Sequence, residues 1–128
     1  MRQFCGMSHR GDLAEAANGL KSPQFIMLLS NKTQFETHVK ELEKLYPGVP
    51  SIGCIGMSYD TMDIVESGVG IIAFSDGVSA AAGVMEQAST MPVKYIDRLE
   101  KDLAKVGGSE RDTVCIDFCS GNDACVLT

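Results

Sequence analysis

Short apolar runs alternate along the chain with stretches in which apolar residues recur every three or four positions. The clearest run is residues 24–30 (QFIMLLS), which polar residues bound on both sides. A continuous apolar run of this length predicts a central strand covered on both faces of a sheet. Another buried strand is expected at residues 50–56 (PSIGCIG), and further strands at residues 3–7, 69–75 and 113–118.

Helical spacing of apolar residues predicts three helices, and a capping sequence predicts the start of a fourth. Their first residues are Asp12, Asn31, Pro92 and Ser120. His38 lies in the middle of the second helix, and we expect it on or near the surface. The buried face of that helix is predicted to consist of Phe35, Val39, Leu42 and Tyr46. The buried face of the third is predicted to consist of Val93, Ile96, Leu99, Leu103 and Val106, with Gly107-Gly108 ending the helix.

A turn signal, Asp76-Gly77, separates the strand at 69–75 from residues 78–85 and predicts a β-hairpin. Alternating strands and helices together with this hairpin predict an α/β fold, in which helices pack on a mixed β-sheet. We expect residues 1–128 to form a single domain. Because the chain stops soon after the helix predicted at Ser120, we also expect it to be a fragment of a longer protein, unless a partner covers this end.

Composition narrows the class of protein. The chain has 128 residues, of which 45% are hydrophobic and 22% charged, as in ordinary globular domains. The net charge of −6 is dispersed without a basic stripe, which argues against nucleic-acid binding. No apolar run is long enough to cross a bilayer, and the first residues do not form a secretory signal. We therefore expect a cytoplasmic protein.

Five cysteines, an odd number, are most simply explained as free thiols in a reducing compartment. Cys115 and Cys119 would lie roughly 13 Å apart along a strand, too far to share a metal ion. A thiol nucleophile would need a base, and His9 is the histidine that could approach Cys54 or Cys119 at a common sheet edge. No catalytic signature supports such a pair, so we expect neither an enzyme nor a bound metal or cofactor.

Residues 50–74 (PSIGCIGMSYDTMDIVESGVGIIAF) carry a family resemblance. A strand that ends in Ile52-Gly53-Cys54 and Gly56 is followed by an acidic turn and the apolar strand at 69–74. The order of the preceding strand and helix also matches, as does the later strand that ends in residues 118–121 (FCSG). The chain resembles the FIST N-terminal sensory domain over residues 10–128.

This resemblance implies a noncatalytic input domain of prokaryotic signal transduction. Such a domain would bind a small ligand, possible ligands including amino acids, and would relay the signal to an attached output domain. The implied output domains are a chemoreceptor, a histidine kinase or a cyclic-dinucleotide enzyme.

We expect the ligand at the carboxyl ends of the strands, where α/β sheets usually bind ligands. Arg10 would anchor a ligand carboxylate there, unless it is only a solvated loop charge. Ser120 and Gly121 open a helix whose N–H groups could bind an anion, unless Ser120 caps that helix itself. The expected ligand-binding residues are Arg10, Gly53, Cys54, Gly56, Ser58, Cys119, Ser120 and Gly121.

Two other functions remain open from the sequence. Cys54 and Cys119 at strand ends are compatible with a cysteine-based redox sensor or a thiol enzyme. The apolar residues 124–127 are compatible with a protein-interaction module, including a homodimer.

Overall fold

The computed structural model describes residues 1–56, 58–59, 64–65, 67–85 and 92–118. The chain falls into two compact units, Met1–Val78 (unit 1) and Ser79–Thr128 (unit 2). Among the helices in these ranges, none has both the length and the apolar character needed to cross a membrane.

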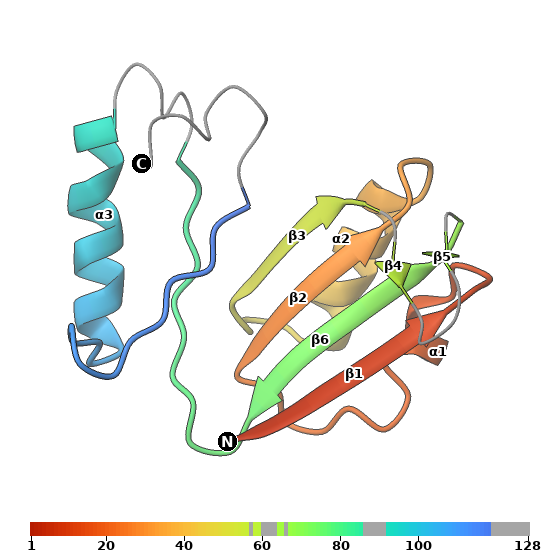
Figure 1. Cartoon of the computed structure of the whole chain (residues 1–128), viewed down its shortest axis with the longest axis horizontal. Coiled ribbons are helices and arrows are strands. Elements are labelled where there is room, and N and C mark those ends of the chain that lie inside the picture. Colours follow the sequence, from red (N-terminus) through yellow and green to blue (C-terminus); the bar gives the residue numbers. More distant parts are fainter. Residues whose placement is uncertain (57, 60–63, 66, 86–91, 119–128) are drawn as a thin grey trace. The chain divides into compact units, whose positions relative to one another are not determined.

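A four-stranded mixed sheet forms the centre of unit 1 (Figure 1). Strands β2 and β3 are parallel, whereas β6 is antiparallel to both of its neighbours, β1 and β2. The mixed sheet, with helices packed on it, confirms the α/β class. The strands follow the order β1 (Arg2–Ser8), β6 (Val69–Ser75), β2 (Phe25–Ser30) and β3 (Ser51–Ile55).

The strand register brings three carboxyl ends to one edge of the sheet. Val69, the first residue of β6, pairs with Ser8 at the end of β1 and with Ser30 at the end of β2. Ser30 in turn pairs with Ile55 at the end of β3. The loops that follow β1, β2 and β3 therefore leave the sheet at the same edge.

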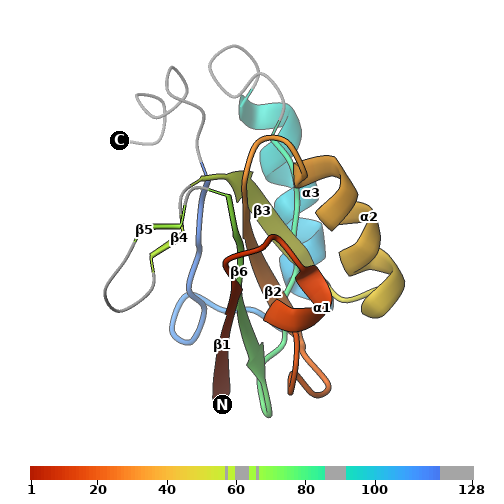
Figure 2. The same cartoon turned by 90° about the vertical axis from the view of Figure 1, so that its right-hand side faces the viewer.

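Helices α1 (Leu13–Ala16) and α2 (Phe35–Leu45) lie on the same face of the sheet (Figure 2). Strand β2 buries alternate side chains against them, and its other side is half-buried. The core between the two layers consists of Leu13, Ala16, Ala17, Ile26, Leu28, Leu42, Val69, Ile71 and Ala73.

Strand β3 differs from its prediction as a buried strand. Its residues alternate between half-buried and exposed, and Ile55 is 54% exposed. Among the residues described, β2 is its only strand partner, so β3 is an outer strand of the sheet. The polar segment that follows contains a short antiparallel ribbon of β4 (Ser58–Tyr59) and β5 (Ile64–Val65).

The predicted hairpin does not form. Asp76 and Gly77 do have the positive φ angles of a tight hairpin turn, 58° and 83°. Residues 78–85, however, are not a strand. Since β6 is already hydrogen-bonded to β1 on one side and to β2 on the other, neither of its edges is open to a further strand.

Helix α3 (Pro92–Lys105) is the one helix in the described part of unit 2. Gly107, with φ of 71°, ends it as predicted. The N–H groups of Gly107 and Gly108 donate to the carbonyls of Ala104 and Leu103 at 3.1 and 3.0 Å, which closes the last turn.

One further prediction for unit 2 is wrong in part and another is wrong. Leu99 and Val106 on the predicted buried face of α3 are half-buried. On the predicted buried face of α3, Ile96 and Leu103 are 43% and 37% exposed, whereas the neighbouring Tyr95 is only 8% exposed. Residues 113–118 are extended and exposed but do not form a strand, because within the described residues no ladder joins them to another segment. The helix predicted at Ser120 lies outside the described residues.

Two substitutions test which face of α2 is buried. Leu42 is 5% exposed, and Leu42→Ala should lower the free energy of unfolding by about 2–5 kcal/mol through the cavity it leaves. Val39 is 42% exposed, so Val39→Ala should change it by about 0.5 kcal/mol or less. Urea unfolding of both variants measures the difference. Equal losses would contradict this assignment of the buried face.

Candidate ligand site at the carboxyl ends of the strands

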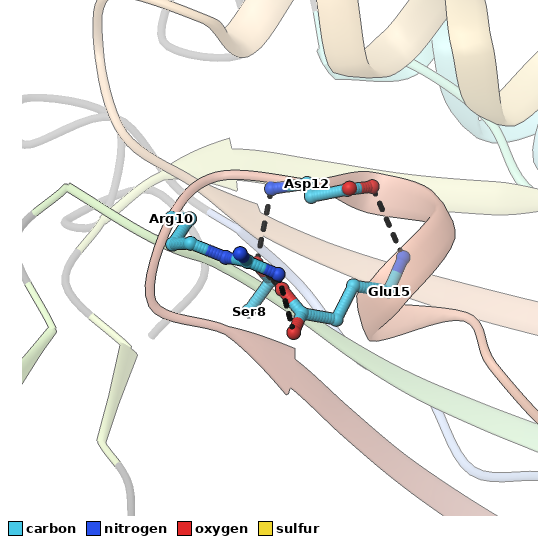
Figure 3. Close-up of polar contacts among 4 residues, drawn as sticks. All are labelled: Ser8, Arg10, Asp12 and Glu15. Atoms are coloured by element: carbon cyan, nitrogen blue, oxygen red, sulfur yellow. Dashed lines mark hydrogen bonds and ion pairs between the residues drawn. The ribbon is translucent and has the colours of Figure 1, made fainter.

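The loop between β1 and α1 is held by a network of local hydrogen bonds (Figure 3). Asp12 caps α1, as predicted, because its carboxylate accepts the N–H of Glu15 at 3.1 Å. The buried Ser8 hydroxyl accepts the N–H of Asp12 at 3.1 Å and donates to Glu15 Oε2 at 2.5 Å. The loop thus brings the Glu15 carboxylate into contact with Ser8, the last residue of β1.

Arg10 in this loop and Glu15 in α1 form an exposed, charged rim, to which Arg10 contributes the cation. Its Nη2 donates to Glu15 Oε1 at 3.1 Å, and the two side chains are 78% and 44% exposed. The hydrogen bond from Ser8 and, to a smaller extent, that from Arg10 hold the pKa of Glu15 below its ordinary value of 4.5. The rim therefore presents a cation and an ionised carboxylate side by side at neutral pH.

A buried layer of polar side chains lies beneath the rim. His38 is 1% exposed, so its predicted place on or near the surface is wrong. Its Nδ1 lies 2.7 Å from Ser30 Oγ, and its Nε2 lies 2.9 Å from the Gly11 carbonyl oxygen. These two partners satisfy both ring nitrogens, which is why α2 can bury a histidine among apolar residues.

The contacts of His38 define its role. A carbonyl oxygen only accepts hydrogen bonds, so Nε2 carries the hydrogen that it donates to Gly11. The Ser30 hydroxyl lies between two partners, 2.7 Å from Nδ1 and 3.1 Å from the Asn31 carbonyl oxygen. The pair has the spacing of a nucleophile and its base, yet Ser30 is 0% exposed and no substrate can reach it. The pair therefore holds structure in place.

Asn31 joins the turn after β2 to the start of β6. Its Oδ1 accepts the N–H of Gln34 at 2.9 Å, which caps the turn that leads into α2. Its Nδ2 donates to the carbonyls of Ser67 and Gly68, at 2.9 and 3.3 Å, and to Gln34 Oε1 at 3.0 Å. The helix start predicted at Asn31 is wrong, because Asn31 caps only this turn, and α2 begins at Phe35 after Gln34, without a side-chain capping bond.

The expected ligand residues are only partly brought together. Gly53 and Cys54 lie within β3, where Gly53 packs closely against the backbone of β2. Gly56 follows β3, and its N–H donates to the Ser30 carbonyl at 3.0 Å, at the same sheet edge as the loop of Arg10. Ser58 begins β4. Outside the described residues lie the remaining expected positions, Cys119, Ser120 and Gly121.

The cysteines in the described ranges are free thiols at separate places. Cys5 and Cys115 are exposed, and Cys54 is half-buried. The pKa of Cys115 is raised, first because neighbouring atoms partly desolvate its exposed thiol and then because the thiol donates a hydrogen bond to Asp117, which makes it less reactive at neutral pH. Within these ranges, three or more metal-ligating side chains do not converge.

Unit 2 has a cavity of its own, of about 290 Å³. Arg98 of α3 lies over the ring of Tyr95, with its guanidinium carbon 5.7 Å from the ring centroid. The cavity contains none of the expected ligand residues. Its lining consists of Gly83, Val84, Tyr95, Arg98, Leu99 and Asp102.

Comparison of the chain with protein-family models, with curated proteins and with solved structures finds no match.

The pKa of Glu15 tests the loop network. Ser8→Ala should raise it more than Arg10→Gln does, because the bond from Ser8 makes the larger contribution. Folding lowers this pKa, so the network's contribution to stability is fully present at pH values above the unfolded-state pKa. The contribution is lost as the pH falls through the folded-state pKa. NMR titration of the Glu15 side-chain carboxyl carbon measures the shift. A larger rise in Arg10→Gln would contradict the assigned order.

Proposed function

We propose that the chain is a noncatalytic sensory domain that binds a small zwitterionic ligand, such as an amino acid, at the carboxyl ends of β1, β2 and β3. The observation that carries this proposal is the exposed pair of Arg10 and Glu15, 3.1 Å apart, on the rim of the first loop. An amino acid presents the matching charges at its own two ends.

The charges of the rim support this ligand class. The Arg10 guanidinium has five N–H donors and uses one of its nitrogens on Glu15, which leaves others for a ligand carboxylate. The Glu15 carboxylate is partly exposed and kept ionised, as an ammonium group requires. The buried network beneath the loop supports binding further, because a rigid site loses less entropy when a ligand binds.

A noncatalytic role agrees with the state of the serine–histidine pair beneath the loop. Ser30 has a histidine partner, but both side chains are buried and the second nitrogen of the ring is occupied by a carbonyl oxygen. Catalysis by a serine requires access of the substrate to the hydroxyl.

The wider assignment follows the FIST-like pattern of residues 50–74. The chain would form one sensory domain in the cytoplasm and would pass ligand binding to an attached chemoreceptor, histidine kinase or cyclic-dinucleotide enzyme. The odd number of cysteines supports a reducing compartment.

A thermal-shift screen against the twenty common amino acids tests the proposal. A ligand at 100 times its Kd should stabilise the protein by about 2.7 kcal/mol, which raises Tm by several degrees. Arg10→Gln should abolish the shift while leaving the Tm of the free protein nearly unchanged, because its ion pair is exposed.

Arg98→Gln is the matched control, since this exposed arginine belongs to the cavity of unit 2. It should leave the shift intact. Loss of the shift in Arg98→Gln alone would move the site to that cavity, and a flat response to every amino acid would reject an amino-acid ligand.

A further inference from the structure

We infer that His38 is a positioning residue that fixes the loop that carries Arg10 and leads to Glu15 against helix α2. This role is a property of the free protein. Only its consequence for ligand affinity rests on the proposed function.

The imidazole of His38 joins three parts of unit 1. It extends from α2, contacts Ser30 at the end of β2 and donates to Gly11 in the first loop. With His38 and Ser30 only 1% and 0% exposed, water cannot readily replace either partner. Loss of the bond to Gly11 would leave a buried donor or acceptor unsatisfied, which makes the bond costly to break.

At Gly11 the loop also packs closely against Gln34, the residue that precedes α2. Gly11 has φ of 72°, a conformation that favours glycine, and an added Cβ would collide with Gln34 Oε1. The Gln34 side chain is itself held by Asn31 at 3.0 Å, so it cannot easily move aside. The carbonyl of Gly11 therefore has a defined position relative to His38.

Arg10 and Asp12 flank Gly11 in the chain, and Asp12 leads into the turn that carries Glu15. A fixed Gly11 carbonyl consequently fixes the backbone from which the side chains of the charged rim, Arg10 and Glu15, extend. Without the bond to His38, Ser8 would still accept the N–H of the Gly11–Asp12 peptide and bind Glu15, but the carbonyl of that peptide would lose its buried partner.

Two substitutions separate the two bonds of the imidazole. The terminal amide of glutamine extends about as far as Nε2, so His38→Gln can keep a donor on the Gly11 carbonyl. The amide of asparagine reaches only about as far as Nδ1, so His38→Asn can keep the contact with Ser30 alone. Both replace a buried ring with a smaller amide, which matches their general effect on packing.

Amide hydrogen exchange of Gly11 and Asp12, followed by NMR, gives the local readout. We expect exchange about tenfold faster in His38→Asn than in wild type, the effect of losing one hydrogen bond. His38→Gln should stay close to the wild-type rate. Equal exchange in the two variants, whether fast or slow, would overturn the positioning role.

A measurement on the wild-type protein covers the case in which His38→Asn fails to fold. The hydrogen on Nε2 should give a slowly exchanging NMR signal with a nuclear Overhauser contact to the backbone at Gly11 and Asp12. A rapidly exchanging ring hydrogen without this contact would also overturn the inference.

Amino acids identified in the thermal-shift screen provide the second readout. Their affinity should fall in His38→Asn and be retained in His38→Gln. If no amino acid binds the wild-type protein, the proposed function fails, whereas the exchange rates still decide the role of His38. If amino acids bind all three proteins equally, the link between this histidine and the ligand is rejected.

Discussion

The antiparallel pairing of β6 with both β1 and β2 is the constraint on which the rest of unit 1 depends. Because β6 runs against both neighbours, β1 and β2 point the same way, and β3 follows β2 in parallel. Three loops from distant parts of the sequence consequently meet at one edge. Their polar groups can then satisfy one another away from water, which a single loop could not achieve.

Much of this fold follows from local patterns that the sequence makes visible. The apolar run at 24–30, the Asp12 cap and the end of α3 at Gly107 each depend on neighbouring residues, and each was predicted correctly. Residues 78–85 and 113–118 were wrongly predicted as strands. A strand also requires an open partner, and no pattern within the segment reveals whether one exists.

The same difference between local patterns and distant partners decides which residues of the candidate site the sequence predicts. Glu15 lies in α1, three residues after Asp12, and this capping-box spacing indicates from the sequence that its carboxylate turns back toward the start of the helix, where it binds Ser8 instead of the Asp12 N–H. His38 could not. Its spacing from Phe35 and Leu42 places it on their face of the helix, but a histidine is buried there only if its ring nitrogens find partners, and these lie 8 and 27 residues away. Only the loops meeting at the sheet edge make its burial favourable.

The pairing of β1 has a consequence for synthesis on the ribosome. Among the described residues its only strand partner is β6, so Arg2 cannot meet Ser75 until nearly all of unit 1 has been translated. Contacts between such distant residues form late, because a long loop must close first. The nascent chain therefore carries its first strand without a strand partner until β6 has been synthesised, and a pause before Val69 would prolong the interval in which β1 is open to aggregation.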